Sequence, residues 1–388
     1  MDIIEEFLKI EEVKKKIFKD ESVLSVNYIP ERPLFREQEL KEIYLEISPI
    51  FDGHKATNLF IYGVTGTGKT MVVRYFLEKV VPKLNKDLMY SYVNCREVGT
   101  EYRVLVKILR DLDIDFPKLG MSTGDAYRKL WESIDQPILV VLDEVDSLVR
   151  RSGDGLLYNF SRSDYVSIIG ISNDTTFTNM LDARTLSSLM KKDILFKPYN
   201  ALQLQEILKQ RAELAFHKGV LDEDVIPLCA ALAAQEHGDA RKAIELLYLS
   251  GKIAVSEGSD RITSEHVKKA VSALEVNNTI ELIKSLPLIQ KGVLYAILSH
   301  MKTHNTTKIS LQDVVSAYDK VRKQLDLPSI SYKSISRIVG EFETYGILEG
   351  RLISLGRGKG VSKILSLKIP MSVLDKISLK ELIISRSD

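Results

Sequence analysis

The sequence predicts an α/β domain built on a parallel sheet, then a small all-helical domain, and then a third domain of helices and a β-hairpin. Three observations support this order. Short β-branched runs alternate with helical patterns in the first half of the chain, helical periodicity alone follows Pro198, and the last third ends in two alternating stretches around a glycine-rich turn. A chain of 388 residues suits two or three domains. We place them at residues 1–197, 198–277 and 278–388.

The strands of the first domain are short runs, and the middle ones are almost entirely apolar, as in parallel strands buried on both faces. They span residues 57–62, 88–94, 138–142, 165–172 and 194–196. Helices of the second domain are expected at residues 201–216, 222–235, 240–257 and 264–274. The third domain is expected to hold helices at 283–303, 310–325 and 331–345 and strands at 347–355 and 361–369.

Composition excludes several classes of protein. No apolar run approaches the roughly 20 residues that cross a bilayer, and the charged N-terminal residues do not resemble a signal peptide. Cys95 and Cys229 lack partners at disulfide-framework or metal-ligand spacing. His300 and His304 lack a third ligand, so a zinc site is not expected. We therefore expect a cytoplasmic protein with reduced thiols and no membrane partner.

Positive charge is concentrated near the C-terminal end. The formal net charge of the chain is only +1, yet residues 301–370 hold twelve Lys and Arg against six Asp and Glu. Residues 351–370 contain basic residues and no acid. A polyanion is expected to meet this part of the chain, although a solvated basic surface would carry the same charges.

A phosphate-binding loop follows the first predicted strand. Residues 63–70 read GVTGTGKT, fit the pattern G-x-x-x-x-G-K-[ST] and lead into residues that favour a helix. Glycines let the backbone amides face the phosphates, and the helix N-terminus adds partial positive charge. Lys69 is expected to reach the β- and γ-phosphates, and the Thr70 hydroxyl to ligate magnesium. The nucleotide-binding residues of this loop are Gly63, Val64, Thr65, Gly66, Thr67, Gly68, Lys69 and Thr70.

Two acids follow the strand predicted at residues 138–142. Asp143 and Glu144 emerge at its C-terminal end, where ligands bind in open α/β sheets. Alone, such a pair is often only a helix cap. After a phosphate-binding loop it predicts that Asp143 holds magnesium through water and that Glu144 is the general base of ATP hydrolysis.

Separated motifs in a fixed order resemble the AAA+ ATPases. More closely, they resemble the archaeal replication-initiator family, which is related to the large subunit of the origin recognition complex and to the cell-division-cycle-six loader. Besides the loop and the acid pair, the motifs are VNC at 93–95, GISND at 170–174, LDARTLSSL at 181–189, KPYNALQLQEILKQRA at 197–212 and GDARKAI at 238–244. The resemblance covers residues 22–370. It implies an AAA+ core, a helical lid and a C-terminal winged helix.

The resemblance also implies roles for single residues. Asn173 takes the sensor-one role beside the γ-phosphate, and Arg241 takes the sensor-two role from the lid. Arg184 resembles the arginine that reaches a neighbouring subunit's γ-phosphate, although Ala183 replaces the proline that usually precedes it. Each residue also has an ordinary interpretation, as a turn asparagine or a surface arginine.

The adenine base is expected to lie between the lid and an N-terminal segment. In the family, the aromatic residue at the position of Tyr199 lines the adenine pocket, and Arg211 adds a second lid-side contact. The segment at residues 28–37, YIPERPLFRE, resembles the family segment that wraps the base, with Ile29 and Pro30 as walls. A packed tyrosine and an exposed arginine are the alternatives for Tyr199 and Arg211.

The third domain is predicted to be a winged helix that binds DNA. Residues 331–346 place apolar side chains on one helical face and polar and basic ones on the other, where they can enter a major groove. The following strands flank a basic glycine-rich tip suited to a phosphate backbone or a minor groove. The predicted DNA-binding residues are Lys333, Ser334, Arg337, Arg357, Gly358 and Lys359. A winged helix used for protein contact is the alternative.

A second DNA contact is a weaker hypothesis. Where the family carries a helical insertion that widens its DNA contact, this chain has only residues 150–164. The apolar run Leu156-Leu157-Tyr158 within them is proposed to face DNA, although such a run more often packs inside a protein.

Together these features predict an ATP-dependent replication initiator that binds origins in double-stranded DNA and helps to load the replicative helicase. ATP/ADP and Mg²⁺ are the expected cofactors, with slow hydrolysis acting mainly as a switch. The protein is expected at the nucleoid, with a paralogue or a second copy as a further partner on DNA. Two alternatives stay open: a DNA motor of the branch-migration helicase type, and a transcriptional regulator that only senses ATP.

Overall fold

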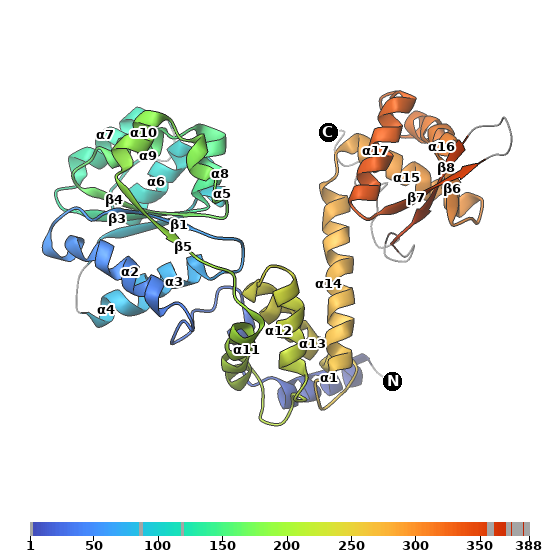
Figure 1. Cartoon of the computed structure of the whole chain (residues 1–388), viewed down its shortest axis with the longest axis horizontal. Coiled ribbons are helices and arrows are strands. Elements are labelled where there is room, and N and C mark those ends of the chain that lie inside the picture. The colour runs from blue at the N-terminus through green and yellow to red at the C-terminus, as the bar shows by residue number, and fades with distance from the viewer. Residues whose placement is uncertain are drawn as a thin grey trace. The chain divides into compact units, whose positions relative to one another are not determined.

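The computed structural model describes residues 3–84, 88–117, 120–354 and 361–369, together with Leu374 and Ile383. It divides into two compact units, Met1–Ala270 and Val271–Asp388. The first contains the α/β domain and the helical lid, and the second contains the C-terminal helices and hairpin (Figure 1). Among the described residues, no helix is both long enough and apolar enough to cross a membrane.

A five-stranded parallel sheet forms the centre of the first unit, in the order β2-β3-β4-β1-β5. The strands are β1 (Asn58–Tyr62), β2 (Tyr90–Asn94), β3 (Ile138–Asp143), β4 (Val166–Ser172) and β5 (Lys191–Leu195). Every residue of β1, β3 and β4 is buried, because strands flank both edges and helices cover both faces. The predicted parallel sheet is confirmed.

The last strand differs from its prediction. β5 begins at Lys191, whereas the predicted strand begins at residue 194. Only Ile194 is buried among its residues, since β5 lies at the edge of the sheet. An edge strand lacks the continuous apolar run that marks a strand buried on both faces, so its first residues carried no signal.

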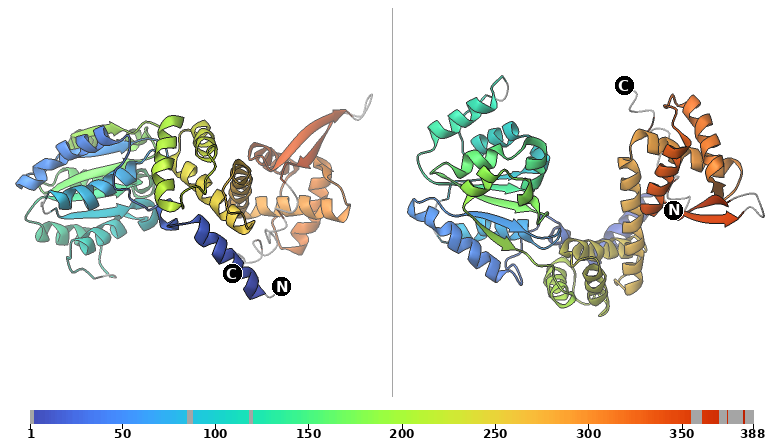
Figure 2. Two further views of the ribbon diagram at one scale, coloured as in Figure 1. Left: turned by 90° about the horizontal axis from the view of Figure 1, so that it is seen from below. Right: turned by 45° about the horizontal axis from the view of Figure 1, so that its top comes forward.

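Helices cover both faces of the sheet (Figures 1 and 2). One face packs on α2 and α3 through a core that includes Ile43, Val72 and Phe76. The other packs on α6 to α9 through a core that includes Leu105 and Leu130. The helices are α2 (Glu37–Ile47), α3 (Lys69–Tyr75), α4 (Val81–Lys83), α5 (Cys95–Val98), α6 (Glu101–Asp111), α7 (Thr123–Ser133), α8 (Val145–Ser152), α9 (Gly155–Ser161) and α10 (Ala183–Leu189).

The lid consists of α11 (Ala201–Ala215), α12 (Val225–Gln235), α13 (Ala240–Ser256) and the start of α14 (Ser264–Ser285). The N-terminal helix α1 (Ile3–Ile17) also packs on it. Phe18, which follows α1, is buried with its ring 5.0 Å from that of Phe216. Gly251 of α13 makes room for this ring, because a Cβ there would lie 2.6 Å from Phe18. The residues before the sheet therefore belong partly to the lid surface.

α14 is longer than predicted. It continues past the expected boundary at residue 277 and ends at Ser285, and α15 (Leu288–Thr303) begins after Pro287. Residues 275–282 contain no glycine or proline that would end a helix. Pro287 lacks the amide hydrogen and disfavours a helical residue before it, which explains why the break falls there.

The second unit has the architecture of a winged helix. α15, α16 (Leu311–Gln324) and α17 (Tyr332–Thr344) share one apolar core with a three-stranded antiparallel sheet of order β6-β8-β7. The strands are β6 (Lys308–Ser310), β7 (Leu348–Ser354) and β8 (Val361–Leu367). The predicted apolar face of α17 is confirmed, with buried Ile335, Ile338, Val339 and Phe342. β6 was not predicted, since three residues give too short a pattern.

Candidate functional site

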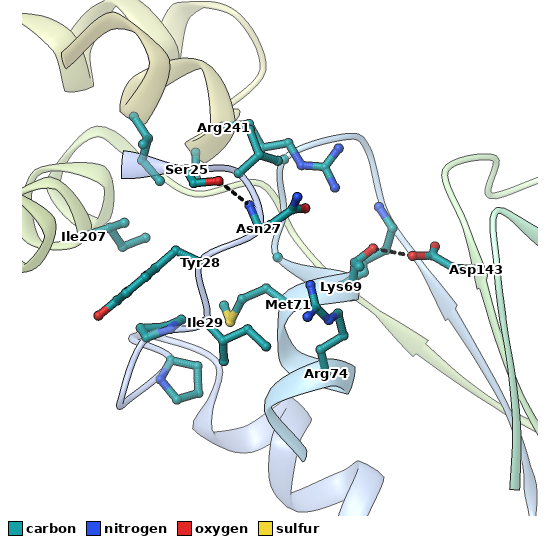
Figure 3. Close-up of a pocket in the computed structure, with 18 of the residues that line it drawn as sticks. Ser25, Asn27, Tyr28, Ile29, Lys69, Met71, Arg74, Asp143, Ile207 and Arg241 are labelled. Carbon is teal, nitrogen blue, oxygen red and sulfur yellow. Dashed lines mark hydrogen bonds between the residues drawn. The ribbon is translucent and has the colours of Figure 1, made fainter. Parts of the chain in front are cut away.

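A cavity of about 810 Å³ lies between the sheet and the lid within the first unit (Figure 3). Its walls come from the N-terminal segment 24–34, the loop at 63–70, the carboxyl ends of β2, β3 and β4, and the lid helices α11 and α13. The sequence predicted a nucleotide at this edge of the sheet.

The loop at residues 63–70 has the geometry of an anion cradle. Gly66 and Gly68 adopt left-handed φ angles of 77° and 89°, which residues with a Cβ rarely adopt. A Cβ on Gly66 would also strike Asp239, and one on Gly68 would lie 2.8 Å from the Tyr199 hydroxyl. Gly68 is the N-cap of α3, so the free amides of that helix face the loop.

The Lys69 ammonium lies within this loop. Its Nζ donates to the carbonyl oxygens of Gly63 (2.6 Å) and Val64 (2.9 Å), and only 5% of the residue is exposed. Burial lowers the pKa of Lys69 to about 8, and the nearby Asp143 carboxylate opposes this shift. The flexible side chain can exchange these carbonyls for phosphate oxygens.

Thr70 and Asp143 meet as the magnesium prediction requires. Thr70 Oγ1 donates to Asp143 Oδ2 at 2.8 Å, and the Tyr92 hydroxyl donates to the same oxygen. The Glu144 amide donates to Asp143 Oδ1 at 2.9 Å. Burial and the carboxylate raise the pKa of Tyr92 above its ordinary value, so it remains a donor. A hydroxyl and a carboxylate are ligands that Mg²⁺ accepts, and this donor set fits the ion.

Glu144 lines the same cavity and immediately precedes α8. Its φ of 53° lies in the left-handed region, which costs a non-glycine residue roughly 1 kcal/mol or more. Its Oε2 lies 3.7 Å from Nη1 of Arg96, so a cation faces the carboxylate. Strained backbone of this kind is frequent at functional sites. The role of Glu144 as general base stays a prediction.

The two predicted sensors reach the cavity from different elements. Asn173 follows β4, and Arg241 belongs to α13 of the lid. Figure 3 shows the Arg241 side chain extending from the lid toward the end of the cavity that holds Lys69. Arg184 lies exposed on α10 instead of lining this cavity, so its predicted contact is with a neighbouring subunit.

Ile29 and Pro30 line the cavity, and Figure 3 labels Ile29 there. Their role as walls of the adenine site stays a prediction. Arg211 also lines the cavity and contacts the N-terminal segment. Its guanidinium donates to the carbonyl oxygens of Val23 (2.8 Å) and Tyr28 (3.3 Å) and lies 4.3 Å from the centre of the Tyr28 ring. Burial lowers the pKa of Arg211 to about 10. Arg211 is therefore buried rather than the exposed arginine of the alternative interpretation.

Tyr199 lines the cavity where the sheet domain passes into the lid, and its ring is buried. Its hydroxyl accepts a hydrogen bond of 2.9 Å from Nε of Arg36, which lies 163 positions earlier in the sequence. The predicted site residues do not include Arg36, Tyr92, Arg96 or Asp239, although all four lie at or beside the cavity. Arg36 lies in the segment 28–37 and Asp239 in the motif GDARKAI, but the contacts of all four residues form only in the folded chain.

The predicted DNA-binding helix has its polar face in solvent. Lys333 is exposed, and Arg337 is 74% exposed with Nη1 at 3.6 Å from Glu341. Ser334 lies half-buried and donates its amide to the Ser331 hydroxyl that caps α17. The predicted wing-tip residues Arg357, Gly358 and Lys359 lie outside the described residues.

The hypothesis that the run Leu156-Leu157-Tyr158 faces DNA is wrong for its two leucines. Leu156 is 1% exposed and Leu157 is fully buried. Both lie on α9 and join the core beneath the sheet together with Phe160. Burial in this core removes far more apolar surface from water than a surface contact would, so the leucines pack inside.

A parallel sheet with a phosphate-binding loop after β1, an acid pair after β3 and a helical lid over the cavity defines an AAA+ ATPase-type protein, here with a winged-helix domain. Models of three protein families match the chain in the same order. They are described as an AAA domain (residues 52–172), a Cdc6 AAA+ ATPase-type lid domain (residues 205–272) and a CDC6 C-terminal winged helix domain (residues 281–376).

Curated relatives cover almost the whole chain. An ORC1-type DNA replication protein 1 of Sulfurisphaera tokodaii is 40% identical over 353 residues, which is 89% of this chain and 88% of that protein. An ORC1-type DNA replication protein of Pyrococcus furiosus is 41% identical over 359 residues, covering 88% and 85% of the two chains. The chain belongs to the family of ORC1-type DNA replication proteins.

A structural match to a solved protein is consistent with membership of this family. The Aeropyrum pernix ORC1 protein, determined in complex with DNA, matches with a TM-score of 0.76 and 36% identity over 94% of this chain and 97% of that one. The Cdc6p of Pyrobaculum aerophilum, at 24% identity and a TM-score of 0.61, shares the fold.

Proposed function

We propose that this protein is an ATP-dependent DNA replication initiator, which binds origin DNA through its winged helix and helps to load the replicative helicase. The observation that carries the proposal is that Lys69, Thr70 and Asp143 line one cavity and that α17 exposes Lys333 and Arg337, in a chain that belongs to a family of replication proteins. The DNA complex of the Aeropyrum pernix ORC1 protein supports the DNA-binding part.

The nucleotide site supports ATP binding with Mg²⁺. The loop amides and Lys69 would neutralise phosphate charge, and Thr70 and Asp143 would hold the ion. When bound, Mg²⁺ polarises the β- and γ-phosphates. Glu144 accepts a proton from the attacking water, and Asn173 orients that water. Slow turnover at this site would make ATP a switch between two positions of the lid.

Arg241 links the lid to this switch. It extends from α13 toward the phosphate end of the cavity, so a triphosphate gives it a partner that a diphosphate lacks (Figure 3). Arg184, exposed on α10, supplies the corresponding contact to a second copy or a paralogue on DNA.

The proposed DNA binding rests on the positive charge and the solvent exposure of side chains on α17. α17 presents Lys333 and Arg337 to solvent, and its apolar face is fixed in the core. Such a helix can lie in a major groove, with the residues of its first turns at the base edges. DNA binding would also place the protein at the nucleoid. Family membership favours this initiator over a branch-migration motor.

The experiment that tests the proposal measures binding of the full chain to origin duplex and to a scrambled duplex, with ATP, with ADP and without nucleotide. We expect tighter binding to the origin duplex and an affinity that depends on the nucleotide. Equal affinity for both duplexes, or the same affinity in all three nucleotide states, would contradict the proposed function.

A further inference from the structure

Arg36 is a buried arginine that lies behind the nucleotide cavity and has a partner for each nitrogen of its guanidinium. Only 4% of the residue is exposed. Nε donates to the Tyr199 hydroxyl (2.9 Å), Nη2 to the Lys197 carbonyl (2.5 Å) and Nη1 to the Glu39 carboxylate (2.7 Å). The guanidinium also lies 4.2 Å from the centre of the Tyr199 ring and 5.1 Å from that of Phe196.

These partners join the sheet domain to the lid. β5 ends at Leu195 and α11 begins at Ala201, so residues 196–200 are the connection between the two. Glu39 belongs to α2, which packs on the sheet. A buried arginine whose bonds all depend on one geometry resists displacement, since a lost partner leaves a charge unpaired. Arg36 therefore fixes the connection to the sheet domain.

Tyr199 in turn contacts both the phosphate-binding loop and the lid. Its hydroxyl lies 2.8 Å from the position of a Cβ on Gly68, and its carbonyl oxygen lies 2.2 Å from the position of a Cβ on Gly238. Only glycine fits at either contact. Tyr199 is thus packed between the loop and the turn that precedes α13.

The same turn is bonded to the loop and leads to Arg241. The Ala240 amide donates to the Gly66 carbonyl at 3.2 Å. Asp239 lies against Gly66 and caps α13 by accepting a hydrogen bond of 2.8 Å from the Arg241 amide. A shift of Tyr199 would therefore move this turn and, with it, the side chain that extends into the cavity (Figure 3).

We propose that Arg36 is a positioning residue of the nucleotide site, which acts through Tyr199 to set the lid turn and so places Arg241 at the γ-phosphate. The inference rests on the ATP-binding function proposed above. It assigns a preference of the site for triphosphate over diphosphate to Arg36, which does not itself line the cavity.

Two conservative variants of the full chain test this role. Arg36→Lys keeps the charge but removes the fork that binds Tyr199 and Lys197 together, and Tyr199→Phe keeps the ring but removes the hydroxyl. Calorimetry measures the affinity of each for a non-hydrolysable ATP analogue and for ADP. We expect roughly tenfold weaker binding of the analogue and a loss of under about twofold for ADP. Arg32→Lys, at an exposed arginine of the same segment, is the control and should change neither affinity.

A cycle with Arg241→Ala distinguishes positioning from a loss of general stability. In the wild-type background, Arg241→Ala should also weaken binding of the ATP analogue more than binding of ADP. In the Arg36→Lys or Tyr199→Phe background, the same change should cause little further loss of analogue affinity. Full additivity, or equal losses for the analogue and ADP, would overturn the inference. If Arg36→Lys fails to fold, the Tyr199→Phe cycle decides by the same criteria. Wild-type protein that binds no nucleotide would instead refute the proposed function itself.

Discussion

The buried Lys69 ammonium donates hydrogen bonds to two loop carbonyls, and burial lowers its pKa. Lys69→Ala should weaken ATP binding by roughly 10- to 100-fold, because it removes the ammonium that is proposed to contact the β- and γ-phosphates. Isothermal titration calorimetry with MgATP measures the effect. Unchanged affinity would show that the nucleotide does not bind at this loop.

The pH dependence of ATP affinity provides a second test of the role of Lys69. Its pKa of about 8 lies well below the ordinary lysine value, and phosphate binds the charged form. ATP affinity should therefore stay level below pH 8 and fall as the pH rises above it. The same titration of Lys69→Ala should lack this fall, and a parallel pH dependence in both proteins would assign it to another group.

Substitution of Glu144 is expected to slow ATP hydrolysis without changing ATP binding. Glu144→Gln keeps the shape and the strained backbone but cannot accept a proton, so we expect unchanged ATP affinity and turnover reduced by roughly 10²- to 10⁴-fold. Single-turnover assays of ATP hydrolysis measure this change. Turnover at the wild-type rate would exclude Glu144 as the base.

Among the elements, α17 is the part whose proposed function follows most directly from its exposed face. Arg337→Ala should cost about 1 to 3 kcal/mol of binding free energy on the preferred duplex, with a smaller loss on a scrambled duplex, if the guanidinium reads a guanine. Salt titrations on both duplexes provide the measurement. Lys284→Ala, which removes one positive charge from α14, is the control and should alter both affinities slightly and alike. An equal loss on both duplexes for Arg337→Ala would show that α17 does not select sequence.

How well each element could be predicted depends on how local its signal is. The loop at 63–70, Asp143 and the apolar face of α17 appear as short patterns, so their neighbours along the chain were enough. β5 and the leucines of α9 depend on where the sheet edge and the core fall, which no short window contains. The contact of Arg36 with Tyr199 joins positions 163 apart and depends on the tertiary fold.

At the scale of the whole molecule, hydrolysis should depend on assembly. Arg184 does not line the cavity of its own chain, and we propose that it acts as an arginine finger on a neighbouring subunit. Arg184→Ala should lower ATP turnover in samples where copies meet on DNA and leave turnover unchanged at dilutions where the protein is monomeric. Sedimentation distinguishes the monomer from the assembly on DNA, and a phosphate-release assay measures ATP turnover in each. A loss of the same size in the monomer would contradict the role in a neighbouring site.

The central claim, that this chain initiates replication at origins, is tested most directly by a genome-wide map of the DNA that the protein occupies in cells. We expect occupancy to be concentrated at the sites where replication begins, and to be strongly reduced at those sites for the Arg337→Ala variant. Occupancy spread over promoters, with no enrichment where replication begins, would contradict it.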